Sequence, residues 1–167
     1  TGICFIGERP FPEFVGSYLS GEEGNIINEN DDVIGIHQGL VFYTLGQRQG
    51  LGIGGLKDYD ERPWYVVEKK LSENILVVAQ GNDNQQLFNN KLSVDSINWI
   101  CEPDLTEPIK LEAKIRYRQD DQECILSKKG KTFSVEFKKP QRAITPGQSI
   151  VFYQDNICLG GGEIYKS

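Results

Sequence analysis

The residue of greatest chemical interest is Cys4, which stands in the segment TGICFIGER. Gly2 and Gly7 leave the backbone around it open, and Arg9 is close to it in sequence. A nearby cation lowers the pKa of a thiol and raises the fraction of thiolate, the form that attacks electrophiles or carries sulfur. These residues alone leave two interpretations open, a nucleophilic or sulfur-carrying cysteine and a buried structural one.

The other cysteines and the single histidine offer weaker chemistry. Cys101, Cys124 and Cys158 form no C-x-x-C pair, which argues against a zinc site. Each has Ile or Leu beside it, so the pattern predicts three buried, apolar thiols. His37 has no Asp or Cys at metal-ligand spacing, and we expect a hydrogen-bonded structural histidine rather than a catalytic base.

The most distinctive stretch is HQGLVFYTLGQRQGLGIGG, residues 37–55. Its last glycines fit G-x-G-x-x-G, a pattern that marks a dinucleotide site only when a strand precedes it and a helix follows. Here a polar Gln-Arg-Gln triplet precedes the glycines, and Pro63 would stop a following helix early. The pattern therefore favours a backbone that bends sharply or approaches another surface closely.

A second candidate for binding chemistry is the segment Arg116-Tyr117-Arg118-Gln119. Arginine forks suit phosphate groups, and an aromatic ring stacks on an unpaired base, so this segment offers RNA contact chemistry. A solvated strand end with its tyrosine packed inward explains the same pattern equally well. The net charge of −6 argues against a free-standing nucleic-acid binder, but residues 105–167, with 11 basic and 8 acidic side chains, are the better candidate for RNA contact.

Length and composition indicate a soluble globular chain. Its 167 residues suffice for one ordinary domain or two small ones, and its 38% hydrophobic and 25% charged residues are normal for such proteins. No run approaches the ~18 apolar residues that a membrane span requires. The sequence has no methionine and begins in mid-pattern, so we expect an excised portion of a larger protein.

The first half of the chain predicts a small mixed module, residues 10–82. Helical spacing of apolar residues indicates one short helix over residues 10–19, begun by a proline. Ile26-Ile27 and Val33-Ile34 flank a polar turn and predict a hairpin. The run GLVFYTLGQ fits either a strand or one and a half helical turns, whereas PWYVVEKK and NILVVAQG predict a second hairpin.

Residues 83–167 predict strands only. The strands are LSVDSINWI, IKLEAKIRYRQ, ECILSKK, KTFSVEFKK, SIVFYQ and ICLGGGEIY. Alternation in the second of them places Ile109, Leu111, Ala113, Ile115 and Tyr117 on one face. Six short strands without a helix predict a six-stranded antiparallel β-barrel, because closure removes the exposed edges of a sheet. The expected fold class is therefore mainly β.

Five segments together resemble the bacterial tRNA-specific 2-thiouridylases, whose older label is tRNA (5-methylaminomethyl-2-thiouridylate)-methyltransferase. They are TGICFIGER, GxHQGLxxYTLGQRxGLGIGG, WYVVxKxxxxNxLxVxQG, RYRQ and TPGQSxVFYxxxxCLGGGxI. The resemblance covers essentially the whole chain, in order and with natural spacing. It covers only the C-terminal part of the family's enzyme.

The resemblance implies an ATP-dependent replacement of the C2 oxygen of the wobble uridine of tRNA by sulfur from a cysteine persulfide. The family's persulfide cysteine stands in the TGICFIGER motif, so the role is carried onto Cys4. The cysteine that can form a disulfide with it, and the SGGxDS-type ATP loop, belong to an N-terminal domain that this sequence does not contain. The family's C-terminal barrel resembles the second domain of elongation factor Tu and grips tRNA, and its RNA-binding residues match Arg116, Tyr117 and Gln148.

The resulting expectation has three parts. Residues 1–9 end the ATP-pyrophosphatase catalytic domain, residues 10–82 form the central module, and residues 83–167 form a barrel that binds the tRNA anticodon arm. A sulfur-relay protein or cysteine desulfurase would load Cys4 in the cytoplasm, the other domain would bind ATP, and no metal, membrane or cofactor of this piece is expected. Two alternatives remain open: an independent RNA-binding or scaffold module, and a redox protein that pairs Cys4 with another thiol.

Overall fold

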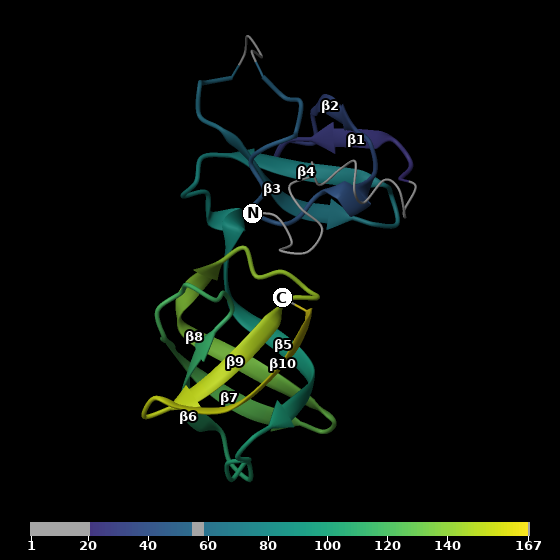
Figure 1. Cartoon of the computed structure of the whole chain (residues 1–167). Coiled ribbons are helices and arrows are strands. Elements are labelled where there is room, and N and C mark those ends of the chain that lie inside the picture. The colour runs from purple at the N-terminus through teal and green to yellow at the C-terminus, as the bar shows by residue number, and fades with distance from the viewer. Residues whose placement is uncertain (1–20, 55–58, 167) are drawn as a thin grey trace, which may run out of the picture. The chain divides into compact units, whose positions relative to one another are not determined.

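The computed structural model of the chain describes residues 21–54 and 59–166, which Figure 1 draws in colour. The described part is mainly β, with ten strands and two 3-10 helices of three residues each. The chain divides into two compact units, Thr1–Leu87 and Phe88–Ser167. The helix predicted over residues 10–19 lies outside the described residues.

The first unit contains a four-stranded sheet in the order β2-β1-β4-β3. Its strands are β1 (Gly24–Ile27), β2 (Val33–His37), β3 (Trp64–Lys70) and β4 (Ile75–Gln80). Each of the two antiparallel pairs, β1 with β2 and β3 with β4, is a predicted hairpin, and both hairpins are confirmed. The two central strands, β1 and β4, run parallel to each other, which joins the hairpins into one sheet.

The ambiguous run GLVFYTLGQ is helical only briefly, because η1 spans Leu40–Phe42 and the chain extends again at Tyr43. Apolar side chains of this run cover one face of the sheet. The core that results comprises Ile26, Leu40, Tyr43, Leu51, Val66, Leu76 and Val78, all less than 10% exposed. The described part of the distinctive stretch that follows β2, residues 38–54, is therefore mainly a loop that packs against one face of the sheet.

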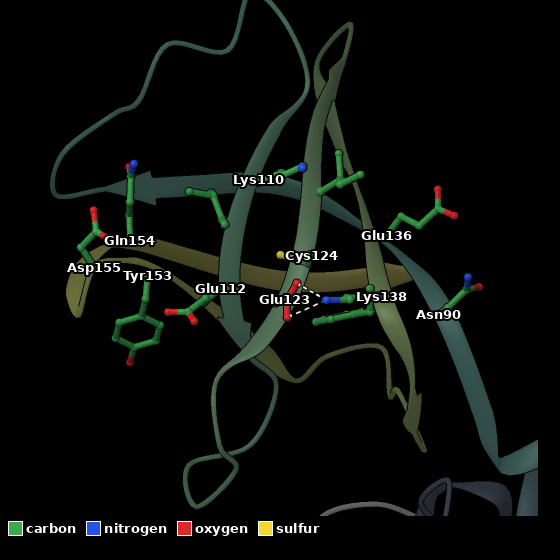
Figure 2. A pocket seen from close by; sticks show the side chains of 13 residues that line it. Asn90, Lys110, Glu112, Glu123, Cys124, Glu136, Lys138, Tyr153, Gln154 and Asp155 are labelled. Atoms are coloured by element: carbon green, nitrogen blue, oxygen red, sulfur yellow. Dashed lines mark hydrogen bonds and ion pairs between the residues drawn. The ribbon is translucent and has the colours of Figure 1, made fainter.

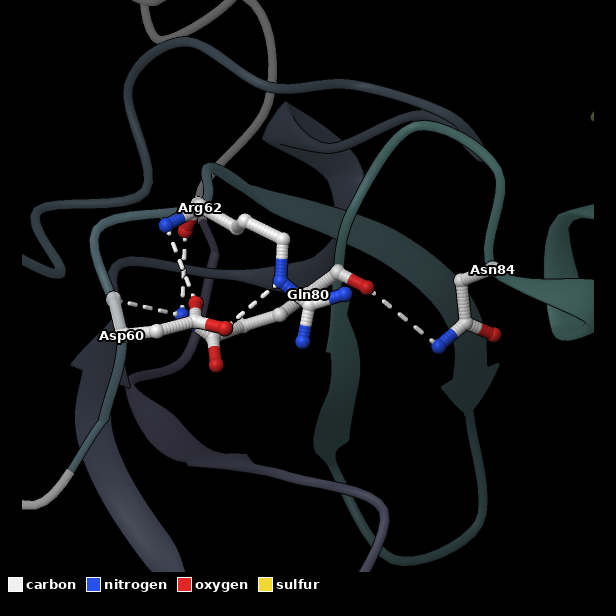
Figure 3. A network of polar contacts seen from close by, with 4 residues as sticks. All are labelled: Asp60, Arg62, Gln80 and Asn84. Atoms are coloured by element: carbon white, nitrogen blue, oxygen red, sulfur yellow. Dashed lines mark hydrogen bonds and ion pairs between the residues drawn. The ribbon is translucent and has the colours of Figure 1, made fainter.

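A polar network fixes the chain segment that enters β3 (Figure 3). The side-chain amide of Gln80, at the end of β4, donates to the carbonyl oxygens of Asp60 and Arg62 at 3.0 Å each. The carboxylate of Asp60 accepts from the Arg62 side chain at 2.6 Å, and this contact holds the pKa of Asp60 below its ordinary value. Asn84 extends the network by donating to the Gln80 carbonyl at 3.4 Å.

The second unit is a closed six-stranded barrel in the order β10-β5-β8-β7-β6-β9, with every neighbouring pair antiparallel (Figure 1). It follows η2 (Gln85–Leu87). Its strands are β5 (Phe88–Trp99), β6 (Ile109–Lys114), β7 (Gln122–Lys129), β8 (Thr132–Arg142), β9 (Ser149–Gln154) and β10 (Ile157–Lys166). The predicted barrel is confirmed.

Alternation explains the barrel core but not the end of β6. Leu111, Ala113 and Ile115 point inward and are at most 6% exposed, as predicted. Tyr117 does not continue this face, because β6 ends at Lys114 and the side chain of Tyr117 is 96% exposed. The strand period cannot be extended past the residue at which the backbone leaves the sheet.

Candidate functional site

Cys4 lies outside the described residues, so the structure does not position its thiol. The first described residues pack closely against the loop that follows β2. A Cβ on Gly39 would lie 2.5 Å from the Cα of Gly21, and Gly39 has φ +127°, a conformation that side-chain-bearing residues rarely adopt. The backbone at Gly21 is thereby fixed to the corner between β2 and η1.

His37 forms the centre of this corner and is completely buried. Its Nδ1 accepts a hydrogen bond from the backbone N–H of Gly39 at 3.0 Å. The neutral ring therefore carries its proton on Nε2, which donates to the carbonyl oxygen of Asn74 at 3.0 Å. The side chain of Asn74 in turn donates to the carbonyl oxygen of Glu23 at 2.9 Å. The expected structural role of His37 is confirmed.

Lys69 fixes the same loop from β3. Its Nζ donates to the carbonyl oxygens of Leu40 and Tyr43 at 3.2 and 3.0 Å. Burial lowers the pKa of Lys69, because a partly desolvated ammonium group is less favourable than a solvated one. A lysine that binds two carbonyl groups closes the end of η1, where backbone acceptors would otherwise lack partners.

The RYRQ segment is a turn at one end of the barrel. The backbone N–H of Gln119 donates to the carbonyl oxygen of Arg116 at 3.1 Å, which closes the turn directly after β6. The guanidinium of Arg116 donates to the carbonyl oxygen of Arg142 at the end of β8, at 3.2 Å. Tyr117 and Arg118 project into solvent. The turn thus presents an exposed aromatic ring flanked by two arginines.

Gln119 of the RYRQ segment holds this turn in place together with Gln141 and Gln122, two glutamines that the sequence did not single out. Gln119 accepts from the backbone N–H of Ile115 at 3.2 Å and donates to the buried side chain of Gln141. Gln141 donates to Gln122 at 3.2 Å, at the start of β7. Paired amides link strands β6, β7 and β8 here, and no spacing in the sequence indicates such a chain of contacts.

Gln148 lies at the same end of the barrel, immediately before β9. Its backbone N–H closes the TPGQ turn by donating to the carbonyl oxygen of Thr145 at 3.2 Å. The register of β6 with β9 pairs Lys114 with Val151, so the start of β9 adjoins the end of β6. We name this barrel end, formed by the 116–119 and 145–148 turns, the RYRQ rim.

The side chain of Gln148 differs from those of the RYRQ turn. Its Oε1 is shielded from solvent and accepts no hydrogen bond within the described part of the chain. A buried acceptor without a partner is unfavourable by about 1–3 kcal/mol, which is a reason to expect a ligand or a rearrangement there. The structure therefore brings the three predicted RNA-binding residues to one rim, with two of them exposed and one shielded.

The cysteines of the barrel differ in exposure. Cys124 on β7 is 4% exposed, as predicted, and lies below a hollow of about 700 Å³ on the barrel wall beside Glu112 and Glu123 (Figure 2). Burial, with a smaller contribution from Glu112, raises the pKa of Cys124 to about 12. The prediction for Cys101 is wrong: β5 ends at Trp99, and the thiol is exposed beyond it.

This difference predicts selective alkylation. With iodoacetamide at pH 8 in native buffer, Cys101 should react readily and Cys124 at least about 100-fold more slowly, because the thiolate is the reactive form and Cys124 is both protonated and shielded. Peptide mass spectrometry after a time course measures both rates. Unfolding in guanidinium should make the two rates equal, and comparable rates in the native protein would contradict the assigned burial.

Two family models match separate parts of the chain. Residues 12–80 match the tRNA methyl transferase PRC-barrel domain, and residues 89–164 match the aminomethyltransferase beta-barrel domain. The tRNA-specific 2-thiouridylase MnmA of Stutzerimonas stutzeri strain A1501 is 54% identical over 167 residues, which is 100% of this chain. The chain belongs to the tRNA-specific 2-thiouridylase family.

Other thiouridylases are similarly close. The MnmA proteins of Pseudomonas fluorescens strain SBW25 and Pseudomonas aeruginosa strain UCBPP-PA14 are 54% and 52% identical over 164 residues, 98% of this chain. The chain spans 44% of the length of each of these relatives. The family is therefore identified from a part that corresponds to less than half of each relative's length.

The described residues of this chain do not fit ATP. Gly50 and Gly52 have φ +77° and +67°, but no helix begins in the loop that contains them, up to Gly54. A phosphate-binding loop needs a following helix whose N-terminal N–H groups point at the phosphates. Within residues 21–54 and 59–166, no cluster of three His, Cys, Asp or Glu side chains could hold a metal ion, and no helix is long and apolar enough to cross a membrane.

Proposed function

We propose that this chain is the C-terminal part of an ATP-dependent tRNA sulfurtransferase, which replaces the C2 oxygen of a wobble uridine with sulfur. The name shared by the curated relatives and the two family models support the proposal. In this proposal, residues 1–9 end the ATP-pyrophosphatase domain and Cys4 bears the persulfide. A central module and the barrel then position the anticodon arm of tRNA.

The observation that carries the RNA-binding role is the geometry of the RYRQ rim. Tyr117 is almost fully exposed between Arg116 and Arg118, on a turn that hydrogen bonds fix to the barrel. A tyrosine with only a packing role would point into the core. A ring exposed to solvent between two arginines instead suits stacking on a base beside a phosphate. Gln148 is proposed as the third RNA-binding residue, since its turn adjoins the same rim.

The sulfur chemistry is assigned to residues outside the described part. The terminal sulfur of a Cys4 persulfide would bond to C2 of the adenylated uridine, and the C2–O bond would break with AMP as the leaving group. The partner cysteine would then attack the Cys4 sulfur. That attack breaks the sulfur–sulfur bond to the nucleoside, forms a cysteine disulfide, and leaves 2-thiouridine for release. A reductant restores the two thiols. ATP supplies the activation of the base in a domain outside this chain.

We also propose a sulfur donor, a cellular compartment and a limit on what the chain can do alone. A sulfur-relay protein or cysteine desulfurase would supply the persulfide in the cytoplasm. The chain by itself should neither bind ATP nor thiolate tRNA, because we expect the ATP loop and the partner cysteine to belong to another domain. An ATP-dependent activity of the purified chain would contradict this division.

Charge reversal and loss of the ring at the RYRQ rim test the RNA-binding role. The double variant Arg116→Glu/Tyr117→Ala of the whole protein should raise the Kd for unmodified tRNA about 100-fold. A stacked base contributes about 1–3 kcal/mol and a charged hydrogen bond about 1.5–3 kcal/mol, and about 1.4 kcal/mol corresponds to tenfold. Fluorescence anisotropy over a series of salt concentrations should also show a shallower slope of log Kd, by about one unit.

A matched control separates the rim from the overall charge of the barrel. Lys128→Glu reverses an exposed charge near the other end of β7, far along the strand from Gln122 at the rim. We expect its Kd to stay within about twofold of the parent. Equal weakening by both variants, or no weakening by the rim variant, would remove the proposed role of Arg116 and Tyr117.

A further inference from the structure

The loop after β2 surrounds a cavity in the first unit, whereas the RYRQ rim belongs to the barrel. It has a volume of about 520 Å³ and is formed by residues 38–50 of the stretch that is most distinctive in the sequence. We name it the loop cavity. Its walls are the side chains of Gln38, Phe42, Tyr43, Thr44, Gln47 and Gln49.

The side chains that line the loop cavity in the described part of the chain are uncharged, partly aromatic and partly polar. Phe42 and Tyr43 contribute aromatic surface, while Gln38, Thr44 and Gln49 are exposed. The side chains of Gln38 and Gln49 make no hydrogen bond to any residue that the structure describes, so each offers both a donor and an acceptor to a ligand. Lys69 of the supporting sheet is directed at backbone carbonyl groups and does not line the cavity.

The shape of the cavity is fixed before any ligand enters. Gln47 accepts from the backbone N–H of Thr44 and donates to the carbonyl oxygen of Gln49, at 2.9 Å each. The backbone of Gly46 donates to Val66 at 2.8 Å, and Val66 donates back to Gln47 at 3.0 Å, which ties the loop to β3. Such preorganisation reduces the entropy lost on binding.

We propose that the loop cavity binds one unpaired nucleobase of the tRNA, an inference that rests on the proposed function and adds a second RNA contact to it. Amide side chains match the donors and acceptors on the edges of a base, and an aromatic wall accepts its flat face. A volume of this size is in the range of small-ligand sites.

The charge of the surrounding unit favours a base over a phosphate group. Residues 21–87 carry 11 acidic and 5 basic side chains, so the net negative charge of this part disfavours the close approach of phosphate groups. A nucleobase carries no charge, so it can enter the loop cavity while the phosphate groups of its nucleotide stay in solvent. The barrel rim, in contrast, offers arginines suited to phosphates.

Removal of the two available amides tests the inference. Gln38→Ala/Gln49→Ala in the whole protein should raise the Kd for unmodified tRNA about tenfold, while Gln85→Ala, an exposed glutamine of the same unit, leaves it unchanged. Circular dichroism should show that both variants are folded, because neither amide has a structural partner in the described residues. The salt dependence of the Kd should not change, since no phosphate contact is lost.

Comparison with the rim variant distinguishes the two claims. If the rim variant weakens binding and the amide variant does not, the loop cavity has no RNA role and the proposed function remains. If neither variant weakens binding, the proposed function also fails. If the amide variant loses thiolation activity at unchanged tRNA affinity, the cavity serves another part of the reaction and the inference is overturned.

A photoreactive side chain provides an independent readout. Phe42→p-benzoylphenylalanine places the reactive group in the cavity wall, and irradiation of the tRNA complex should attach one nucleotide that sequencing identifies. The same group at Leu71, which is 74% exposed in the β3–β4 turn, should not attach that nucleotide. Crosslinking at position 42 to protein alone would overturn the assignment to RNA.

Discussion

Cys4→Ser in the whole protein should lower the rate of tRNA thiolation by at least about 10³-fold, with tRNA affinity within about twofold of the parent. A hydroxyl cannot hold a transferable sulfur as a persulfide does, so the loss is one of chemistry and not of binding. The measurement is the initial rate of 2-thiouridine formation with saturating ATP and sulfur donor, followed by nucleoside mass spectrometry. A persulfide-specific label should mark the parent at Cys4 and leave the variant unlabelled.

The control for this experiment is Cys101→Ser, because Cys101 is exposed and therefore open to the same reagents. We expect it to retain full activity. Near-normal thiolation by Cys4→Ser would remove the catalytic assignment, and a disulfide between Cys4 and a barrel cysteine in the oxidised chain would favour the redox alternative. Retained activity in the control with loss in the Cys4 variant would leave only the sulfur-carrying role.

Gly162→Ala should destabilise the barrel by about 3 kcal/mol, because β10 passes the end of β5 too closely for a side chain. A Cβ at this position would overlap the carbonyl oxygen of Ser96 and lie 2.6 Å from Cγ1 of Val94, which is fully buried in the core. β10 is the strand that closes the barrel, through its pairs with β5 and β9. Displacing it therefore disturbs two ladders at once.

The tryptophans make this prediction measurable for the barrel alone. The sequence has two, Trp64 in the first unit and Trp99 in the barrel, where the Trp99 ring lies 6.1 Å from that of Phe152. In a Trp64→Phe background, urea unfolding followed by tryptophan fluorescence reports the barrel only, which matters because a chain of two units need not unfold in one step.

Gly130→Ala is the matched glycine control. Gly130 lies in the β7–β8 turn with φ +63°, and a Cβ there would have no atom within 4 Å. It should lose only the roughly 1–2 kcal/mol of an unfavourable left-handed backbone. If the two variants lose equal stability, the close approach of β10 to β5 does not limit the barrel.

Local sequence patterns were sufficient for the strands. The period-two alternation of Leu111, Ala113 and Ile115 marks the inner face of β6, and burial in the barrel follows it. Turn residues between such runs divided the second half into six strands, and a sheet of six short strands has few ways to remove its edges other than closure. The fold class was therefore determined by information that lies within about ten residues of each position.

The same local information failed where strands end. Tyr117 and Cys101 continue strand-like patterns in the sequence, yet both are exposed because the backbone leaves the sheet before reaching them. The last paired residue of a strand depends on the length and register of its neighbours, and these belong to distant parts of the chain. A helical run as short as Leu40–Phe42 was ambiguous for the same reason.

By itself, the sequence determined the family resemblance and the positions of most strands along the chain. It also determined the types of residue available for chemistry at Cys4, Arg116, Tyr117 and Gln148. Only the tertiary structure showed that Arg116, Tyr117 and Gln148 share one barrel rim. It also showed that hydrogen bonds among Gln119, Gln141 and Gln122 hold this rim. Both ring nitrogens of His37 are hydrogen-bonded to the backbone of Gly39 and Asn74, which no sequence pattern indicated. Residue types and periodicity are properties of one segment. Partners are properties of the folded chain, because hydrogen bonds and burial are made between segments that no spacing in the sequence connects.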